Sequence, residues 1–250
     1  VVNLGYSDRQ WKPMDGYIKK LRDEGIAVHA ALGNHEVMGK AKTGERKFQQ
    51  RFPNHVKTGF VEILDSVAVV MLNSNFGKLS KKEDDEQIAW YKKTLAELDA
   101  DSSILFIISG CHHSPYTNSK IVGASKDVQD RFVKPFIQSA KSRLFLSGHC
   151  HGFEHYKMEG KDFMVIGGGG GLHQPLKTAG SFDDLAKDYK PMFHYITVER
   201  KGKELDVKSF KLCNKFEVFE EGFVLNISQD LSADRNLASK SPKEETSTTQ

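Results

Sequence analysis

The sequence predicts an α/β fold, because short apolar runs alternate with longer segments in which apolar residues recur at helical spacing. In the first part of the chain we expect strands at residues 1–4, 26–32, 60–64, 67–72, 104–108 and 144–146. We expect helices over the amphipathic segments between these runs, at residues 11–22, 86–98 and 128–140. The pattern then changes to short segments typical of antiparallel strands, at residues 153–156, 163–166, 195–198 and 205–210.

Length and composition indicate one folded domain followed by a polar tail. A chain of 250 residues with 38% hydrophobic residues has enough apolar material for a sizeable core. We assign residues 1–230 to this domain and expect residues 231–250 to be disordered, because they are polar and lack aromatic side chains. The net charge of +3 is small, so no nucleic-acid partner is implied. No apolar run is long enough to span a membrane, and three cysteines make no disulfide framework.

Local signals mark the ends of several elements. Pro13 lies near the start of the first helix, where proline is tolerated, and Gly25 ends that helix. A strand, a helix and a strand then follow one another over residues 1–32, which is the pattern of a right-handed βαβ unit. Asp65 and Ser66 join two strands as a hairpin turn.

The polar and basic stretch at residues 37–58 reads as a loop with a short helix near residues 48–52. Farther along, the helix at residues 86–98 carries acidic residues close to its start. Asp84 and Asp85 lie there, where they interact favourably with the helix dipole.

Three of the predicted strands run into glycine and then into side chains of the metal-ligand type. The junctions are Gly33-Asn34-His35-Glu36, Gly110-Cys111-His112-His113 and Gly148-His149-Cys150-His151. A single His-x-His pair is equally consistent with ordinary surface residues. Three junctions are different, because parallel strands bring their carboxyl ends to one edge of a sheet, where ligands bind. A mixed set of histidine and asparagine suits divalent or trivalent metals, so the sequence predicts a metal site at this edge.

These blocks resemble a known family. Together they are similar to the GNH[ED], H-x-P and GHxHxxE motifs of calcineurin-like metallophosphoesterases, a superfamily that includes purple acid phosphatases. The residues that carry the resemblance are Gly33 to Glu36, His113-Ser114-Pro115, and Gly148 to His151 with Glu154. Trp11 and the Gln87-x-x-Trp90-x-x-x-x-Leu95 segment are also similar to secreted members of the purple acid phosphatase type. The resemblance covers roughly residues 1–200 and implies a four-layer α/β/β/α sandwich of two mixed sheets flanked by helices.

The resemblance also implies the roles of individual residues. Asn34, His113 and His149 match ligands of one metal ion, and His151 matches a ligand of a second. His35 matches a histidine that contacts the substrate phosphate and protonates the leaving oxygen. The choice between adjacent histidines follows the His-x-Pro spacing, which selects His113. Further candidates, as metal ligands or as residues supporting the ligands, are Tyr6, Asp8, His112 and Glu154; Tyr116 and Asn118 are candidates for substrate contact by position alone.

The sequence departs from the family pattern at its start. Family members carry an Asp-x-His block on a first strand, which we expect upstream of Val1, and a Gly-Asp that bridges two metals. Here Gly5 is followed by Tyr6, so either Tyr6 replaces that aspartate or a short stretch is absent and Asp8 lies close enough to serve. The family reading predicts a phosphate-ester hydrolase with a dinuclear metal centre (Fe, Zn or Mn) and a metal-bound hydroxide. The alternatives are a non-catalytic protein with the same fold and a partial metal site, or an amidohydrolase-type barrel, which would need more βα repeats.

The partner implied is a phosphorylated substrate, either a small molecule or a nucleotide; the sequence does not identify it or the oligomeric state. The resemblance favours export to the periplasm or the extracellular space over a cytoplasmic location. The five-glycine run at residues 167–171 lacks the Lys-Ser/Thr and the helix start of a phosphate-binding P-loop. We therefore interpret it as a segment that passes close to the site.

Overall fold

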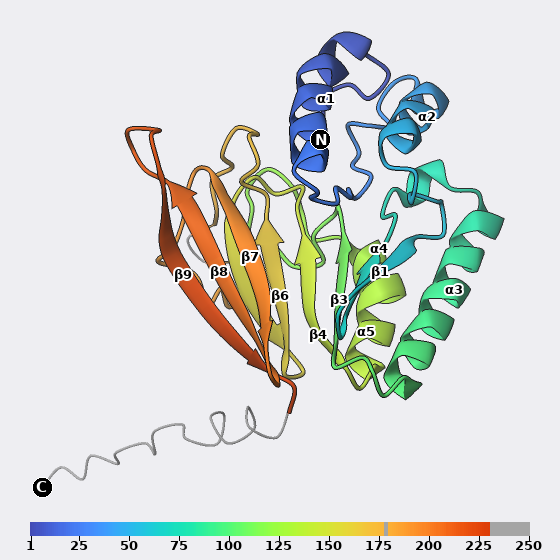
Figure 1. Cartoon of the computed structure of the whole chain (residues 1–250), viewed down its shortest axis with the longest axis vertical. Helices are drawn as coiled ribbons and strands as arrows, with labels where there is room; N and C mark the ends of the chain where they lie inside the picture. Colours follow the sequence, from blue (N-terminus) through green and yellow to red (C-terminus); the bar gives the residue numbers. More distant parts are fainter. Residues whose placement is uncertain (178–179, 231–250) are drawn as a thin grey trace, which may run out of the picture.

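A six-stranded mixed sheet forms the centre of the computed structural model, which describes residues 1–177 and 180–230 (Figure 1). Its strand order is β1-β2-β3-β4-β6-β5. Strands β2, β3, β4 and β6 run parallel, and β1 and β5 pair antiparallel at the two edges. The bounds are Phe60–Leu64 (β1), Val67–Met71 (β2), Phe106–Cys111 (β3), Ser142–Ser147 (β4), Phe153–Met158 (β5) and Lys161–Ile166 (β6).

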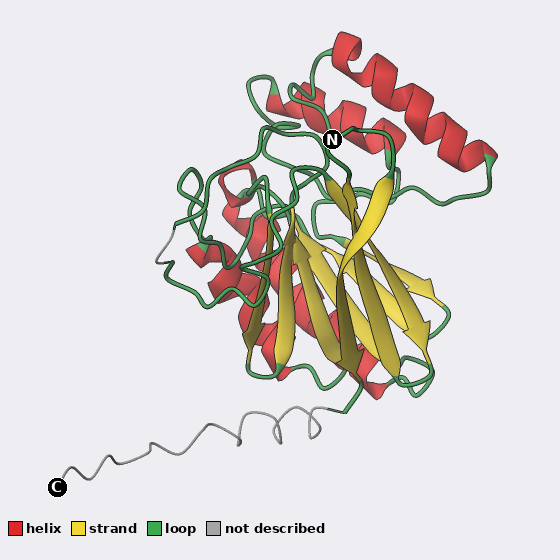
Figure 2. Ribbon diagram, turned by 90° about the vertical axis from the view of Figure 1, so that its left-hand side faces the viewer, coloured by secondary structure: helices red, strands yellow, loops and turns green. Residues whose placement is uncertain are grey.

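A second, three-stranded antiparallel sheet covers part of one face of the first sheet (Figure 2). It consists of β7 (His194–Lys201), β8 (Glu204–Leu212) and β9 (Phe219–Ser228). Leu205, Val207 and Ile227 from this sheet pack against Leu144 and Phe153 of the first sheet. The two-sheet α/β architecture is thus confirmed, although in the described residues the second sheet is antiparallel rather than mixed.

Helices cover the opposite face of the six-stranded sheet. They are α3 (Lys81–Ala100), α4 (Lys126–Val128) and α5 (Lys134–Gln138), with a π-helical turn at Gln129–Val133 between the last two. The interior of this layer is aromatic, and its fully buried members include Tyr91, Phe132, Phe136, Phe145 and Phe163. Helix α3 begins five residues before the predicted start because Ser80 and Glu83 form a capping box there.

Two further helices lie beyond the carboxyl ends of the parallel strands (Figure 1). They are α1 (Asp8–Asp23) and α2 (Ala41–Arg51), and a short 3₁₀ turn at Phe76–Lys78 precedes α3. Trp11 is fully buried between the two helices, and its Nε1–H donates to the carbonyl of Gly5 at 2.7 Å. Arg51 joins α2 to α1 through an ion pair with Asp15. The helix expected near residues 48–52 is therefore longer and begins earlier.

The strands expected at residues 1–4 and 26–32 do not form, so the predicted βαβ unit at the start of the chain is wrong for the described residues. A strand needs a neighbour that accepts and donates along its backbone. The N–H of Val2 donates instead to the Glu36 carboxylate, and that of Leu4 donates to the Gln10 side chain. Residues 26–32 were also expected to be buried, yet Ile26 is 51% exposed. Apolar composition alone does not supply a pairing partner.

The remaining elements follow the prediction within a few residues. The hairpin turns at Asp65, whose backbone has a positive φ of 54°, and the turn between β7 and β8 lies at residues 202–203. Strand β9 was not predicted, because Glu220, Glu221 and Gly222 interrupt its apolar pattern.

The tail expected to be disordered, residues 231–250, lies outside the described residues. Within the described part of the chain, no helix has both the length and the apolar character needed to cross a bilayer.

Candidate metal centre

The ends of two neighbouring parallel strands bring three histidines together. Strands β3 and β4 pair in register at Cys111 and Ser147, so the residues that follow them are also neighbours. His112 and His113 follow β3 directly, and His149 follows β4 after Gly148. The Gly148 N–H donates to the carbonyl of His112 at 3.0 Å, which holds the two strand ends together. The predicted convergence of these two junctions is present in the structure.

The three imidazoles form a compact cluster. One ring nitrogen from each of His112, His113 and His149 lies within 4.8 Å of the others. The ring centroids are 4.6–5.0 Å apart, and Nε2 of His112 lies 3.1 Å from Nδ1 of His149. His149 has a left-handed backbone conformation, with φ of 66°, which is uncommon for a residue other than glycine. Such strain is concentrated at functional sites.

Two polar side chains from other segments orient the cluster, Asn34 from the loop that precedes α2 and Ser74 from the segment that follows β2. The Asn34 Oδ1 lies 2.8 Å from His112 Nε2, so the Gly33–Glu36 block reaches the same site. The hydroxyl of Ser74 lies 2.8 Å from His113 Nδ1 and accepts a bond from the backbone N–H of His113 at 3.0 Å. Asn34 thus contacts His112, whereas the resemblance groups it with His113 as ligands of one metal ion.

The environment keeps the cluster neutral. Burial, reinforced by the neighbouring imidazoles, lowers the pKa of His112 to about 2. Burial and His149 lower the pKa of His113 to about 4, and the pKa of His149 is also below its usual value, chiefly through burial. A neutral imidazole presents a lone pair, which is the form that binds a metal ion. Three imidazole nitrogens and an amide oxygen fit Zn, Mn or Fe.

The cluster opens into a cleft of about 660 Å³. His35, His112, His149 and His151 all line it, so the structure brings four of the predicted site histidines to one space. The ring of His35 is fixed by a contact of 3.0 Å between its Nδ1 and the carbonyl of Asn3. The ring of His151 is fixed in the same way, with Nδ1 2.9 Å from the carbonyl of Leu172. Within the described part of the chain neither Nε2 atom has a hydrogen-bond partner, so Nε2 is the atom available to a ligand.

Other candidates lie away from this cleft. Tyr6 packs beside Gly39 and under Lys40, and Asp8 is paired with Lys47, which holds the pKa of Asp8 below its usual range. Tyr116 faces the core, where its ring lies 5.1 Å from that of Phe163.

Glu154 is fully buried, and its carboxylate accepts hydrogen bonds from three donors within the protein. The donors are the Thr117 hydroxyl, the Asn118 N–H and the Tyr156 hydroxyl, at 2.6–2.7 Å. Thr117 and Asn118 belong to the loop that follows His113. Glu154 therefore ties that loop to β5, which fits a supporting role.

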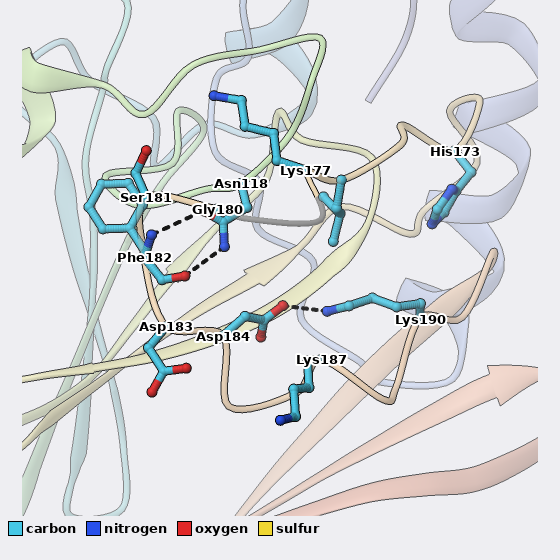
Figure 3. A pocket seen from close by; sticks show the side chains of 11 residues that line it. Asn118, His173, Lys177, Gly180, Ser181, Phe182, Asp183, Asp184, Lys187 and Lys190 are labelled. Carbon is cyan, nitrogen blue, oxygen red and sulfur yellow. Dashed lines mark hydrogen bonds and ion pairs between the residues drawn. The ribbon is translucent and has the colours of Figure 1, made fainter.

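Asn118 faces a second cavity, of about 630 Å³ (Figure 3). Its side-chain amide donates to the carbonyl of Phe182 and accepts from the Phe182 N–H, so it holds the loop that contains Phe182. Lysine side chains surround this cavity, and one of them, Lys190, pairs with Asp184.

Ser74 and Thr117 are the residues that sequence reasoning missed. For Ser74 a signal existed, since the polar run at residues 73–75 follows an apolar strand just as the three histidine junctions do. Thr117 carried no such signal.

The class of fold is now defined. Two packed sheets, with helices on one face and ligand side chains at the carboxyl ends of parallel strands, form the calcineurin-like metallophosphoesterase fold. Among solved structures, a dimetal phosphatase from Danio rerio is similar, with a TM-score of 0.57, 11% identity, and coverage of 91% of this chain and 81% of that one.

GAP50, the anchor in the inner membrane complex of Plasmodium, is similar with a TM-score of 0.53 and 16% identity. That match covers 73% of this chain, which spans 58% of the length of GAP50. No protein-family model matches the chain, and no curated protein sequence matches it. At these identities the likeness establishes the fold.

Proposed function

We propose that this chain is a metal-dependent hydrolase of phosphate esters, acting as a phosphomonoesterase or a phosphodiesterase. The observation that supports this most is the cluster of His112, His113 and His149, whose ligand nitrogens lie within 4.8 Å of one another. The cluster lies at the carboxyl ends of parallel strands, where the family resemblance implies the metals, and it opens into a cleft large enough for a substrate.

The donor set suggests which residues would hold metal. The three imidazoles and the Asn34 amide would hold one ion, and His151 would contribute to a second ion in a dinuclear centre. Bound metal supplies positive charge that offsets the charge of a phosphate ester and lowers the pKa of water. The protein has to exclude competing protons, which it does by keeping the imidazoles neutral.

His35 is the proposed proton donor to the leaving oxygen. Its Nδ1 faces the carbonyl of Asn3, which fixes the proton on Nδ1 in the neutral ring. Only the doubly protonated ring carries a proton on Nε2, and this is the proton that His35 would give to the ester oxygen, which leaves the neutral ring with its proton on Nδ1. A ring on the cleft wall is within reach of a bound substrate.

A non-catalytic protein with the same fold and a partial metal site is the second candidate. It is favoured by the composition of the cluster, because the one three-ligand group among the described residues contains no carboxylate. Metal content separates the two readings. A hydrolase of the proposed type should bind two ions per chain, and a scaffold one or none.

The decisive experiment measures hydrolysis of p-nitrophenyl phosphate and bis-p-nitrophenyl phosphate with added Mn²⁺, Zn²⁺ or Fe²⁺. We expect turnover that a chelator abolishes and that His149→Ala lowers by more than about a hundredfold, since a lost ligand costs at least as much as a lost supporting residue. His173→Ala is the matched control, because His173 is exposed on a loop outside the cluster. No turnover of either ester by a chain that binds two metals would contradict the proposal.

Within the hydrolase reading, a phosphorylated small molecule or nucleotide is the proposed substrate class, and the purple acid phosphatases are the proposed relatives. Export to the periplasm or the extracellular space remains part of this proposal.

A further inference from the structure

The loop that follows β6, residues 167–171, consists of five glycines and is called here the glycine loop. Gly169, Gly170 and Gly171 line the same cleft as the imidazoles of His149 and His151. The loop is therefore a wall of the candidate metal centre, formed by backbone atoms alone.

Three of these glycines are required because neighbouring groups leave no room for a Cβ. A Cβ on Gly167 would lie 1.8 Å from the carbonyl oxygen of Cys150, and a Cβ on Gly168 would lie 2.1 Å from Nδ1 of His194. A Cβ on Gly171 would lie 2.4 Å from the ring of His151. These close contacts, and the bond of 3.2 Å from the His194 N–H to the Gly168 carbonyl, hold the loop in position.

His194 reinforces this support. Its side chain is 5% exposed, and its ring packs edge-on against Phe153 at 5.2 Å. The glycine loop thus packs against two imidazoles, that of His194 near Gly168 and that of His151 near Gly171. These contacts hold the loop against the cleft.

The middle of the loop differs from its ends. A Cβ on Gly169 would meet nothing within 4 Å, so packing inside the protein does not exclude a side chain there. Gly170 has a φ of 129°, which side chains rarely permit. Among the residues that the structure describes, none accepts a hydrogen bond from the N–H of Gly169, Gly170 or Gly171. The loop therefore has unpaired backbone donors in a segment that lines the cleft.

We propose that the glycine loop is an anion subsite that binds the non-reacting oxygens of the substrate phosphate through its backbone N–H groups. Successive unpaired N–H groups form concave anion-binding sites, and the lack of side chains lets the ligand approach the backbone closely. This inference rests on the proposed function only in taking the anion to be the substrate phosphate. It differs from a P-loop, since no helix start or lysine follows the loop.

The test titrates orthophosphate into the ¹⁵N-labelled, zinc-loaded protein and follows the amide resonances of the glycine loop. We expect saturable shifts of the Gly169, Gly170 and Gly171 amides. Absence of such shifts while orthophosphate binds elsewhere on the protein would overturn the proposal. The measurement needs no variant, so it remains decisive even where a substitution disturbs folding.

Gly169→Ala tests the same point by substitution. The methyl group has room in the free protein but occupies the ligand side of the loop, so we expect orthophosphate affinity to fall about tenfold with no change in zinc content or Tm, the loss typical of one displaced hydrogen bond. Gly77→Ala is the matched control, because a Cβ there also meets nothing within 4 Å. Equal orthophosphate affinity in Gly169→Ala and the wild type would contradict the proposal.

The outcomes separate this inference from the proposed function. Orthophosphate shifts at the loop without hydrolysis of any ester would support the anion subsite and overturn the hydrolase reading. Hydrolysis of esters, together with glycine-loop amide resonances that do not shift when orthophosphate is added, would support the hydrolase and overturn the anion subsite.

Discussion

The side-chain oxygen of Asn34 lies 2.8 Å from Nε2 of His112, although 78 residues separate them in the chain. Of the two adjacent histidines, His112 is therefore the one whose ring nitrogen meets Asn34. His113 turns its Nδ1 toward Ser74 instead, at 2.8 Å. The two rings are nearly perpendicular, at 85°, so they present their nitrogens in different directions.

We therefore predict that His112→Ala lowers zinc affinity more than His113→Ala does. Nε2 of His112 faces both Asn34 and His149, and its loss removes the atom at which the two other donors meet. Isothermal titration of zinc into the two variants measures the difference. A larger loss in His113→Ala would instead support the ligand set implied by the His-x-Pro spacing.

Ser74→Ala should weaken metal binding without unfolding the protein. The hydroxyl holds the His113 ring through Nδ1 and also accepts the His113 N–H. Loss of a residue that orients a ligand typically costs about tenfold to a hundredfold in metal affinity. Zinc affinity and Tm should be measured together, with Ser103→Ala as an exposed control that bonds only within its own turn. Unchanged zinc affinity would show that Ser74 does not orient His113.

Glu154→Gln should destabilise the domain by roughly 1–3 kcal/mol, because an amide would place its own N–H groups against donors in a buried site. The carboxylate accepts three hydrogen bonds there, and because the side chain is fully buried, water cannot replace them. Urea unfolding of this variant is compared with that of Glu217→Gln, an exposed carboxylate. Equal free energies of unfolding would mean that Glu154 does not support the loop after His113.

Acid should destabilise the protein partly through His194. Burial lowers the pKa of His194 from 6.5 to about 4, so between these values the unfolded chain binds the additional proton. The free energy of unfolding therefore falls as the pH drops through this window, by up to about 1.4 kcal/mol per pH unit for one group. In His194→Leu the free energy of unfolding should fall less between pH 7 and pH 4.5, because the variant lacks the one proton that His194 takes up on unfolding. Urea unfolding at pH 4.5, 5.5 and 7 measures this difference. If the free energy of unfolding changes with pH by the same amount in the variant and the wild type, the proton is taken up by another group.

Much of the site could be predicted because its residues follow strands. His112, His113 and His149 are each next to an apolar run that ends in glycine or cysteine, and strand ends meet at one edge of a parallel sheet. The turn at Asp65 and the helix α3 could be predicted for the same local reasons, namely a short polar break and helical spacing. The glycine loop could be recognised in the sequence as passing near the site, but its backbone contacts could not.

The amino-acid sequence alone thus determined the class of fold, the strand ends that meet, and the imidazole character of the centre, since periodicity and composition are local properties. Only the tertiary structure decided that Asn34 meets His112, that Ser74 orients His113, and that residues 1–4 and 26–32 remain outside the sheets. Those outcomes depend on which distant segments lie side by side and on which backbone groups find partners. Apolar spacing carries no information about either.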